Sequence, residues 1–185
     1  ASKVSDDNRR IGLFLPYTPL HKLLLAGVQK PLIATSANVH GEPLAQTKEE
    51  ILILEGIWDY CLDHDRNIIN ACDDSVVFTV NEGTHMIRHA RGYAPQTVNL
   101  SYHSGTRVLA VGANQKSSIA LAMKDQVVIS PFIGDLGSVS VLERFKRQIE
   151  RFYKLYQCRP ELIVCDKHPD YDSSRWAYAQ GVAVK

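Results

Sequence analysis

Short runs of apolar and β-branched residues recur along the chain, and turn-forming or small polar residues follow most of them. Runs of this length that stop at glycine, proline or small polar residues are typical of buried strands. We expect strands at residues 11–15, 31–35, 75–80, 107–112 and 162–166. Because helical patterns separate several of these runs, the sequence predicts an α/β fold.

Three segments carry the signals of helices. Residues 20–28 place leucines on one face, which predicts an amphipathic helix. Thr47, with Glu50 three residues later, forms a capping box that starts a second helix ending near Gly56. The periodicity of residues 139–157 predicts a third and longer helix.

Turn-forming residues and a change in composition predict a hairpin and a boundary between two domains. Residues 75–88 read as a hairpin turned at 81–83. Residues 97–105 are polar and contain serines, and a new strand and helix alternation, typical of a largely parallel sheet, begins after them. We therefore expect two domains, 1–104 and 105–185.

The charge balance and the cysteines exclude several classes of protein. Lys plus Arg number 21 against 20 Asp plus Glu, so the basic footprint of a dedicated nucleic-acid binder is absent and any basic site must be local. The four cysteines form no C-x-x-C pair, and we interpret them as reduced, mostly packed thiols. No run approaches the roughly 20 apolar residues of a membrane span, and no signal pattern is visible. A cytoplasmic location is expected, with no membrane partner.

Two groups of candidate ligand-binding residues lie in the first half. Thr35, Ser36 and Asn38, at the exit of an expected strand, offer hydroxyls and an amide to phosphate or carbonyl oxygens, although for this segment taken alone an ordinary turn is the commoner explanation. Arg88 and Arg91 place two permanent cations beside a Gly- and Pro-containing turn, where they suit a polyphosphate. The alternative is a pair of solvated surface arginines.

The second half has its own candidates. Lys116 is the last residue of the loop 112–116, which follows an expected strand and precedes an expected helix. In this position, backbone N–H groups and a lysine commonly bind phosphate. The loop lacks the P-loop pattern. Asp135, Asp166 and His168 follow apolar strands, at the sheet edge where open α/β sheets hold ligands.

The joint order of these motifs resembles the HypF family, the carbamoyltransferases of hydrogenase maturation. Its YrdC-like domain is matched by the segments 15–21, 35–38, 41–43, 72–76 and 88–95. The opening of its Kae1-like domain is matched by 111–116, 130–136 and 166–174. The resemblance therefore implies an α/β fold with a YrdC-like mixed α/β portion followed by the first part of an actin/hexokinase-type domain.

The resemblance also implies an activity. Such an enzyme uses ATP, with Mg²⁺, to convert carbamoyl phosphate into a carbamoyl adenylate, and then transfers the carbamoyl group to the C-terminal cysteine of HypE. The thiocarbamate becomes the cyanide ligand of [NiFe] hydrogenase. The YrdC-like nucleotide and carbamoyl site is implied at Thr35, Ser36, Asn38, Arg88 and Arg91, and the Kae1-like site at Lys116, Asp135, Asp166 and His168. No catalytic nucleophile and no metal ligands are assigned.

Departures from the family pattern qualify the resemblance. No K-x-R stretch precedes Leu15, so we expect the Lys and Arg that complete the nucleotide site to lie upstream, and the family's zinc or iron sites to lie outside this chain. The isolated chain is accordingly expected to be inactive. His40 and the Pro131-Phe132 pair suggest a divergent member.

Two alternative functions remain open. A threonylcarbamoyl-adenylate synthase of tRNA modification shares the Ser-Ala-Asn motif but is not expected to continue into residues 112–174. A double-stranded RNA binding module would use a concave basic face, which the near-neutral charge disfavours. A nucleic-acid partner is therefore not expected.

Overall fold

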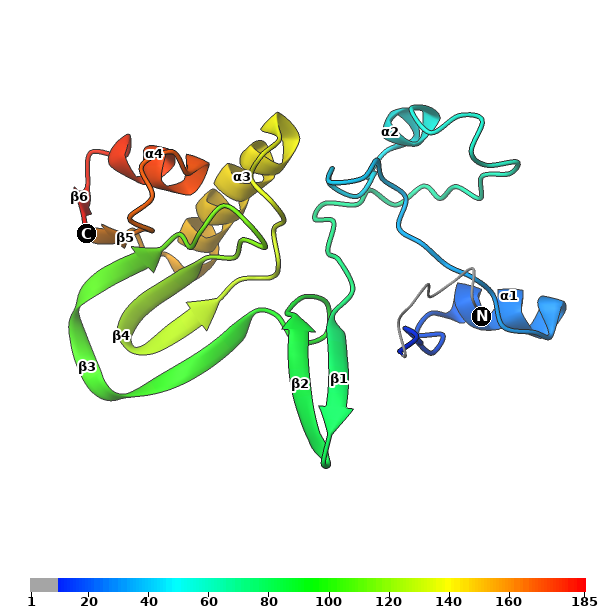
Figure 1. Ribbon diagram of the computed structural model, residues 1–185, viewed down its shortest axis with the longest axis horizontal. Coiled ribbons are helices and arrows are strands. Elements are labelled where there is room, and N and C mark those ends of the chain that lie inside the picture. The colour runs from blue at the N-terminus through cyan, green and yellow to red at the C-terminus, as the bar shows by residue number, and fades with distance from the viewer. Residues whose placement is uncertain (1–9) are drawn as a thin grey trace. The chain divides into compact units, whose positions relative to one another are not determined.

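The computed structural model describes residues 10–185 and divides into two compact units, Ala1–Ser36 and Ala37–Lys185. The first unit contains helix α1 (Pro19–Val28), drawn in blue in Figure 1. Thr18 caps this helix, because its side-chain oxygen accepts the His21 N–H at 3.1 Å. Pro19 suits the first helical position, where no backbone donor is needed. The helix predicted at residues 20–28 is confirmed.

The strands predicted at residues 11–15 and 31–35 are wrong. Both segments are irregular, and neither pairs with a strand among residues 10–185. Leu13 is 86% exposed and Ile33 is 83% exposed, so these apolar runs are not buried in this structure. Apolar composition favours a strand, but a strand persists only when a neighbour satisfies its N–H and C=O groups. Thr35 and Ser36 therefore follow an irregular segment.

The second unit begins with a short helix, α2 (Lys48–Leu52). The Thr47 hydroxyl accepts the Glu50 N–H at 3.2 Å, and the Glu50 carboxylate accepts the Gln46 N–H. The helix start predicted at Thr47 is confirmed, while the return bond of Glu50 goes to the Gln46 N–H and not to the Thr47 N–H that a capping box uses. The helix ends at Leu52, before the predicted end near Gly56.

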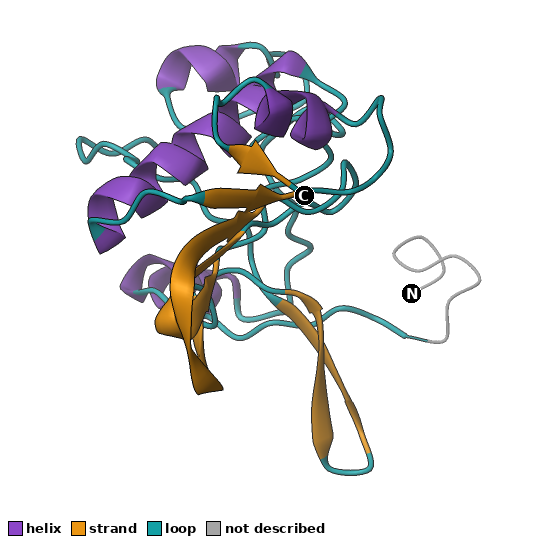
Figure 2. Cartoon of the chain, turned by 90° about the vertical axis from the view of Figure 1, so that its left-hand side faces the viewer, coloured by secondary structure: helices purple, strands orange, loops and turns teal. Residues whose placement is uncertain are grey.

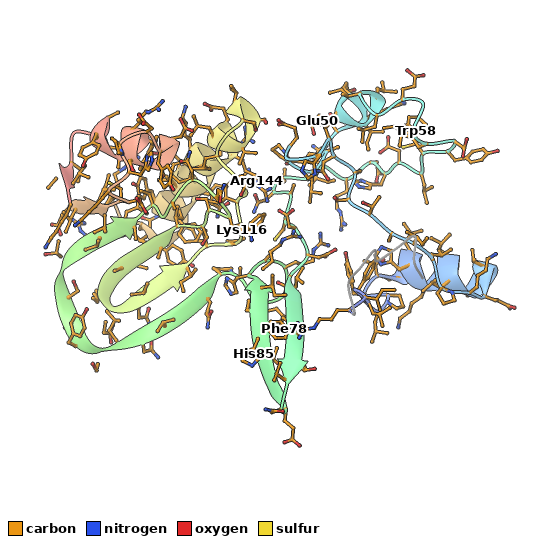
Figure 3. All side chains as sticks on the ribbon, viewed as in Figure 1. Glu50, Trp58, Phe78, His85, Lys116 and Arg144 are labelled. Atoms are coloured by element: carbon orange, nitrogen blue, oxygen red, sulfur yellow. The ribbon has the colours of Figure 1, made fainter. Side chains whose placement is uncertain are left out.

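Strands β1 (Val76–Val80) and β2 (Gly83–Arg88) form the predicted antiparallel hairpin. Asn81 and Glu82 make its two-residue turn, with φ values of 48° and 65°. Positive φ at both turn residues matches the twist of the flanking strands. Phe78 and His85 are register partners and stack with their ring centroids 5.1 Å apart (Figure 3).

A four-stranded sheet follows, in the order β4-β3-β5-β6 (Figure 1). Its members are β3 (Gln96–Ala110), β4 (Ala120–Ile129), β5 (Leu162–Val164) and β6 (Ala183–Val184). β4 is antiparallel to β3, whereas β3 with β5 and β5 with β6 are parallel. β3 runs through residues 104 and 105, and the domain boundary expected between them stays a prediction.

The helix expected after Lys116 is wrong, because the chain turns directly into β4. Ile119 and Leu121 are buried, and Leu121 is the register partner of Leu109. Burial at every second residue is the period of a strand, and it favours pairing with β3 over a helical turn. The loop 112–116 is therefore a connection between two antiparallel strands.

Helices α3 (Val139–Tyr156) and α4 (Asp172–Tyr178) pack against the sheet (Figure 2). Phe145 of α3 is fully buried and meets Trp176 of α4 edge to face, with the ring centroids 5.5 Å apart. Ser138 caps α3, and the helix predicted at 139–157 is confirmed. The core that joins helices and sheet contains Leu109, Val111, Leu121, Phe145, Ile149 and Ile163.

The α/β fold class is confirmed by this arrangement. All four cysteines have free thiols, with Cys158 buried and Cys61 exposed. Among residues 10–185, no helix combines the length and the apolar character that crossing a membrane requires.

Candidate functional site

The segment 88–91 carries both candidate arginines of the first half. It begins at the last residue of β2, and the acidic turn 72–75 holds it in place. The Arg91 N–H donates to the Asp73 carbonyl at 3.1 Å. The Ser75 hydroxyl accepts the Ala90 N–H and donates to the Arg91 carbonyl, both at 2.9 Å. Ala90 is completely buried, so the backbone between the two arginines is fixed by packing as well as by hydrogen bonds.

Phe132 holds the same segment from the other side. Its N–H donates to the His89 carbonyl at 2.8 Å, and the Arg88 guanidinium lies over its ring, 5.0 Å from the centroid. Such a cation–π contact orients a guanidinium without neutralising it. The charged guanidinium of Arg88 is therefore held in a defined orientation.

Arg91 is oriented by the acidic turn 72–75. Its Nη2 donates to the Cys72 carbonyl at 2.9 Å, and its Nε lies 3.5 Å from the Asp74 carboxylate. The Arg91 side chain is nevertheless 49% exposed, which leaves it accessible to a ligand. Burial raises the pKa of the neighbouring Cys72 thiol, which disfavours its thiolate form.

Thr35 and Ser36 belong to the first unit and Asn38 to the second, so a joint role for the three stays a prediction. The Asn38 side-chain amide donates to the carbonyls of Val39 and Glu42, each at 2.9 Å. These two bonds close the loop 38–42. Asn38 thus shapes the loop in addition to any ligand contact.

A cleft of 420 Å³ lies between this loop and α3, within the size range of small-molecule pockets of roughly 300–1,000 Å³. The Glu42 carboxylate accepts hydrogen bonds from Ser138 and Ser140 at the start of α3 and so joins the two walls. Lys146 lowers the pKa of Glu143 on the rim, because its ammonium donates a hydrogen bond to the Glu143 carboxylate and its positive charge stabilises the ionised form. The lining consists of Asn38, Val39, Glu42, Pro43, Leu44, Ala45, Gln46, Glu50, Ile53, Leu54, Ser140, Glu143 and Arg147.

Lys116 and Asp135, two candidates of the second half, are in direct contact. The Lys116 N–H donates to the Asp135 carboxylate at 2.6 Å, and Lys116 has a φ of 49°. Beside them, the Ser117 N–H donates to the Gly134 carbonyl and the Ile133 N–H to the Ser117 carbonyl, both at 2.8 Å. The structure thus joins the loop 112–116 to the segment that follows β4 (Figure 3).

Asn114 of the loop 112–116 bonds to the start of α4, the helix that follows the loop of Asp166 and His168. The Asn114 amide donates to the Asp172 carboxylate at 3.2 Å, and its oxygen accepts the Ser173 N–H at 3.3 Å. Both loops lie at the carboxyl end of the parallel strands β3 and β5, where ligands of open α/β sheets bind.

Asp166 and His168 mainly shape their own loop in this structure. The Asp166 carboxylate accepts the His168 N–H at 2.8 Å. The His168 ring accepts the Asp170 N–H at 3.2 Å and stacks on Tyr171, with centroids 4.4 Å apart. Their loop lies at the sheet edge that carries Lys116 and Asp135. Within the described residues, no hydrogen bond links His168 to Lys116.

Sequence reasoning missed Arg144 on α3, whose guanidinium forms an ion pair with Asp73 at 2.7 Å. The two residues are 71 positions apart, and a lone arginine on a helix carries no local signal. A weak signal exists in the spacing of Ser140, Arg144 and Arg151, which puts polar side chains on one stripe of an otherwise amphipathic helix.

Two family models match the chain. The family described as HypF Kae1-like domain matches residues 103–185, and the family described as telomere recombination, the Sua5/YciO/YrdC group, matches residues 1–90. Carbamoyltransferase HypF of Synechocystis sp. is 40% identical over 98% of this chain. Probable carbamoyltransferase HypF of Methanocaldococcus jannaschii is 34% identical over 95% of it.

Two solved structures are similar along most of the chain. Full-length HypF in a phosphate- and nucleotide-bound form superimposes with a TM-score of 0.93 at 36% identity, covering 98% of this chain and 29% of that one. The HypF of T. kodakarensis gives a TM-score of 0.86 at 32% identity, covering 94% and 24%. The chain spans about a quarter of the curated relatives, 24% of the Synechocystis protein and 23% of the Methanocaldococcus protein.

Proposed function

The chain belongs to the HypF family, and from this membership we propose that it is part of an ATP-dependent carbamoyltransferase. In the proposed reaction, carbamoyl phosphate, ATP and one water molecule form a carbamoyl adenylate, pyrophosphate and phosphate. Water takes up the phosphoryl group of carbamoyl phosphate, and the freed carbamoyl oxygen then displaces pyrophosphate from the α-phosphorus of ATP. The Kae1-like match over residues 103–185 counts against a threonylcarbamoyl-adenylate synthase, which was not expected to continue into this region.

The observation that carries this proposal is the fixed segment 88–91 with its two arginines. Adenylate formation moves negative charge onto the departing pyrophosphate. Cations that are already oriented stabilise this charge without having to reorganise. Arg88 is oriented by the Phe132 ring and Arg91 by the turn 72–75, while Ser36 is proposed to add a hydroxyl contact and Asn38 to hold the shape of the loop 38–42. The phosphate- and nucleotide-bound relative supports a phosphate-binding role. Mg²⁺ is proposed to enter as the ATP complex, held by phosphate oxygens.

The second site is proposed to handle the adenylate after its formation. There the thiolate of a C-terminal cysteine of HypE attacks the carbamoyl carbon, the carbon–sulfur bond forms and AMP leaves with the electron pair of the broken bond. Lys116 supplies a cation for the phosphate of AMP, and Asp135 holds the Lys116 backbone in place. The loop of Asp166 and His168 is proposed to border the same edge, and Asn114 holds the start of the helix α4 that follows this loop. HypE is thus the proposed protein partner.

Calorimetric titration of the chain with MgATP at two salt concentrations tests the first site. Arg88→Ala and Ser36→Ala are expected to weaken binding, Arg88→Ala by about tenfold or more, because hydrogen bonds to charged groups contribute about 1.5–3 kcal/mol. Arg159→Ala is the matched control, since Arg159 also lies over an aromatic ring, 4.9 Å from the centroid of Tyr153. Equal affinity for the Arg88 variant and the control would contradict the proposal.

A separate measurement addresses turnover. The chain covers about a quarter of its relatives, and we propose that it shows no carbamoyl phosphate-dependent exchange of pyrophosphate into ATP by itself. Clear exchange by the isolated chain would contradict this expectation and would assign the complete adenylation site to these residues.

A further inference from the structure

Two structures hold the segment 88–91 in place, the turn 72–75 and Phe132. Among the described residues, Arg144 is the one side chain that contacts both of these supports. Its Nη2 lies 2.7 Å from the Asp73 carboxylate and 3.3 Å from the Ala71 carbonyl. The same nitrogen lies 3.4 Å from the Phe132 carbonyl. The side chain projects from α3 and is only 14% exposed, against 18% for Asp73 (Figure 3).

These contacts link the turn 72–75 to Phe132. The two supports are distant in the sequence, and each contacts the segment 88–91 on its own. On one side, the Asp73 carbonyl accepts the Arg91 N–H at 3.1 Å. On the other, the Phe132 N–H donates to the His89 carbonyl at 2.8 Å, and its ring carries the Arg88 guanidinium. Nη2 carries two N–H bonds that point in different directions within the guanidinium plane, so this one nitrogen can donate to Asp73 and to Phe132 at once.

We propose that Arg144 is a positioning residue that sets the orientation of Arg88 and Arg91 by tying the turn 72–75 to Phe132. The role deepens the proposed function and rests on it, because the orientation matters only if the two arginines bind phosphate. Arg144 itself touches no ligand in this role. Its loss is expected to loosen both supports together, which separates it from an ordinary stabilising ion pair.

Arg151 provides a matched control on the same stripe of α3. It donates to the Ile69 carbonyl at 2.7 Å and to the Asn70 side chain, and so it ties the helix to the chain just before the turn. It contacts neither Asp73 nor Phe132 through any bond in the structure of residues 10–185. Arg151→Met should therefore remove a comparable link without loosening the arginine segment.

The test is amide hydrogen exchange, followed residue by residue by NMR in the 185-residue chain. Arg144→Met is expected to raise the exchange rates of both the Arg91 and the Phe132 amides by about tenfold, the effect of losing hydrogen bonds to a charged group. The Val111 amide, which donates to Val164 at 3.0 Å inside the sheet, is expected to keep its rate. Arg151→Met is expected to change none of the three.

A second variant keeps the inference falsifiable if Arg144→Met disturbs the whole fold. Asp73→Asn removes the negative charge that Arg144 binds and leaves the contact of Arg144 with Phe132, so exchange should rise more at Arg91 than at Phe132. The proposal would be overturned if the Phe132 amide kept its exchange rate in Arg144→Met. It would also be overturned if Arg151→Met raised the exchange rates of both the Arg91 and the Phe132 amides.

Titration with MgATP then separates this role from the proposed function. Arg144→Met is expected to weaken ATP binding by about tenfold in the natural background and not to weaken it further when Arg88 and Arg91 are both replaced by alanine. An additive loss would overturn the positioning role. If the natural chain binds no ATP, the proposed nucleotide site fails, while the exchange rates still decide whether Arg144 ties the two supports.

Discussion

Replacing Lys116 by glycine separates the structural and the functional contributions of this residue. Lys116 has a φ of 49°, a left-handed conformation that side chains disfavour, and its link to Asp135 runs through its backbone N–H. Glycine keeps this N–H and removes only the side chain. Lys124 is the matched control, because it has a φ of 56° and is an exposed residue of β4 away from the candidate loops.

The expected change in stability follows from two opposing effects. The left-handed conformation costs a side-chain-bearing residue about 1–2 kcal/mol, whereas glycine loses more conformational entropy on folding, a cost of about 0.5–1 kcal/mol. These ranges leave a net gain of about 0–1.5 kcal/mol for Lys116→Gly and for Lys124→Gly alike. At about 2–4 °C per kcal/mol for a domain of this size, both variants should melt up to about 6 °C higher, as followed by circular dichroism.

Ligand binding should distinguish the two variants. In an Arg88→Ala background, where the first site is weakened, calorimetric titration with MgATP reports mainly on the second site. Lys116→Gly is expected to lower this affinity by about tenfold, the loss of one charge-assisted contact, and Lys124→Gly to leave it unchanged. A lower melting temperature for Lys116→Gly than for the natural chain, with no change in affinity, would refute the reasoning and make Lys116 a structural residue.

Three further predictions concern the core and its surroundings. Phe145→Ala should lower the free energy of unfolding by about 3–5 kcal/mol in urea titrations, because it empties a fully buried site, whereas Val139→Ala, at an 81% exposed position, should change it by less than about 0.5 kcal/mol. Burial raises the pKa of Tyr153 to about 12. The neutral phenol therefore stabilises the fold below the ordinary pKa of 10.0, and stability should fall as the pH rises from there toward about 12, an effect that Tyr153→Phe should abolish in absorbance and unfolding titrations. A double-mutant cycle of Asp73→Asn and Arg144→Met should give a coupling of about 1–3 kcal/mol, between the values for exposed and buried pairs, and a coupling near zero would show that the pair is solvent-screened.

The elements predicted correctly are those whose signals are local. The hairpin β1–β2 follows from a β-branched run and a two-residue turn, and α3 follows from its apolar stripe. The cap at Thr47 depends on a side chain and an N–H three residues away. Such interactions are complete within one short segment, so the sequence determines them.

The errors have a common cause. The apolar runs 11–15 and 31–35 satisfy the composition of a strand, but no strand pairs with them among residues 10–185. The segment after Lys116 was read as a helix, whereas pairing with β3 makes it a strand. In each case the outcome depends on a partner distant in sequence, which local propensity does not report.

The candidate site shows the same division. Its residue types can be read directly from the amino-acid order: two arginines beside a rigid turn, and a lysine and carboxylates after apolar strands. The packing of distant segments brings Lys116 to Asp135, links Asn114 to the start of α4, and places Arg144 against Asp73 and Phe132. Local chemistry is written in neighbouring residues, but contacts between distant segments form only when the packing of the core brings them together, because that burial offsets the entropy of ordering the chain between them.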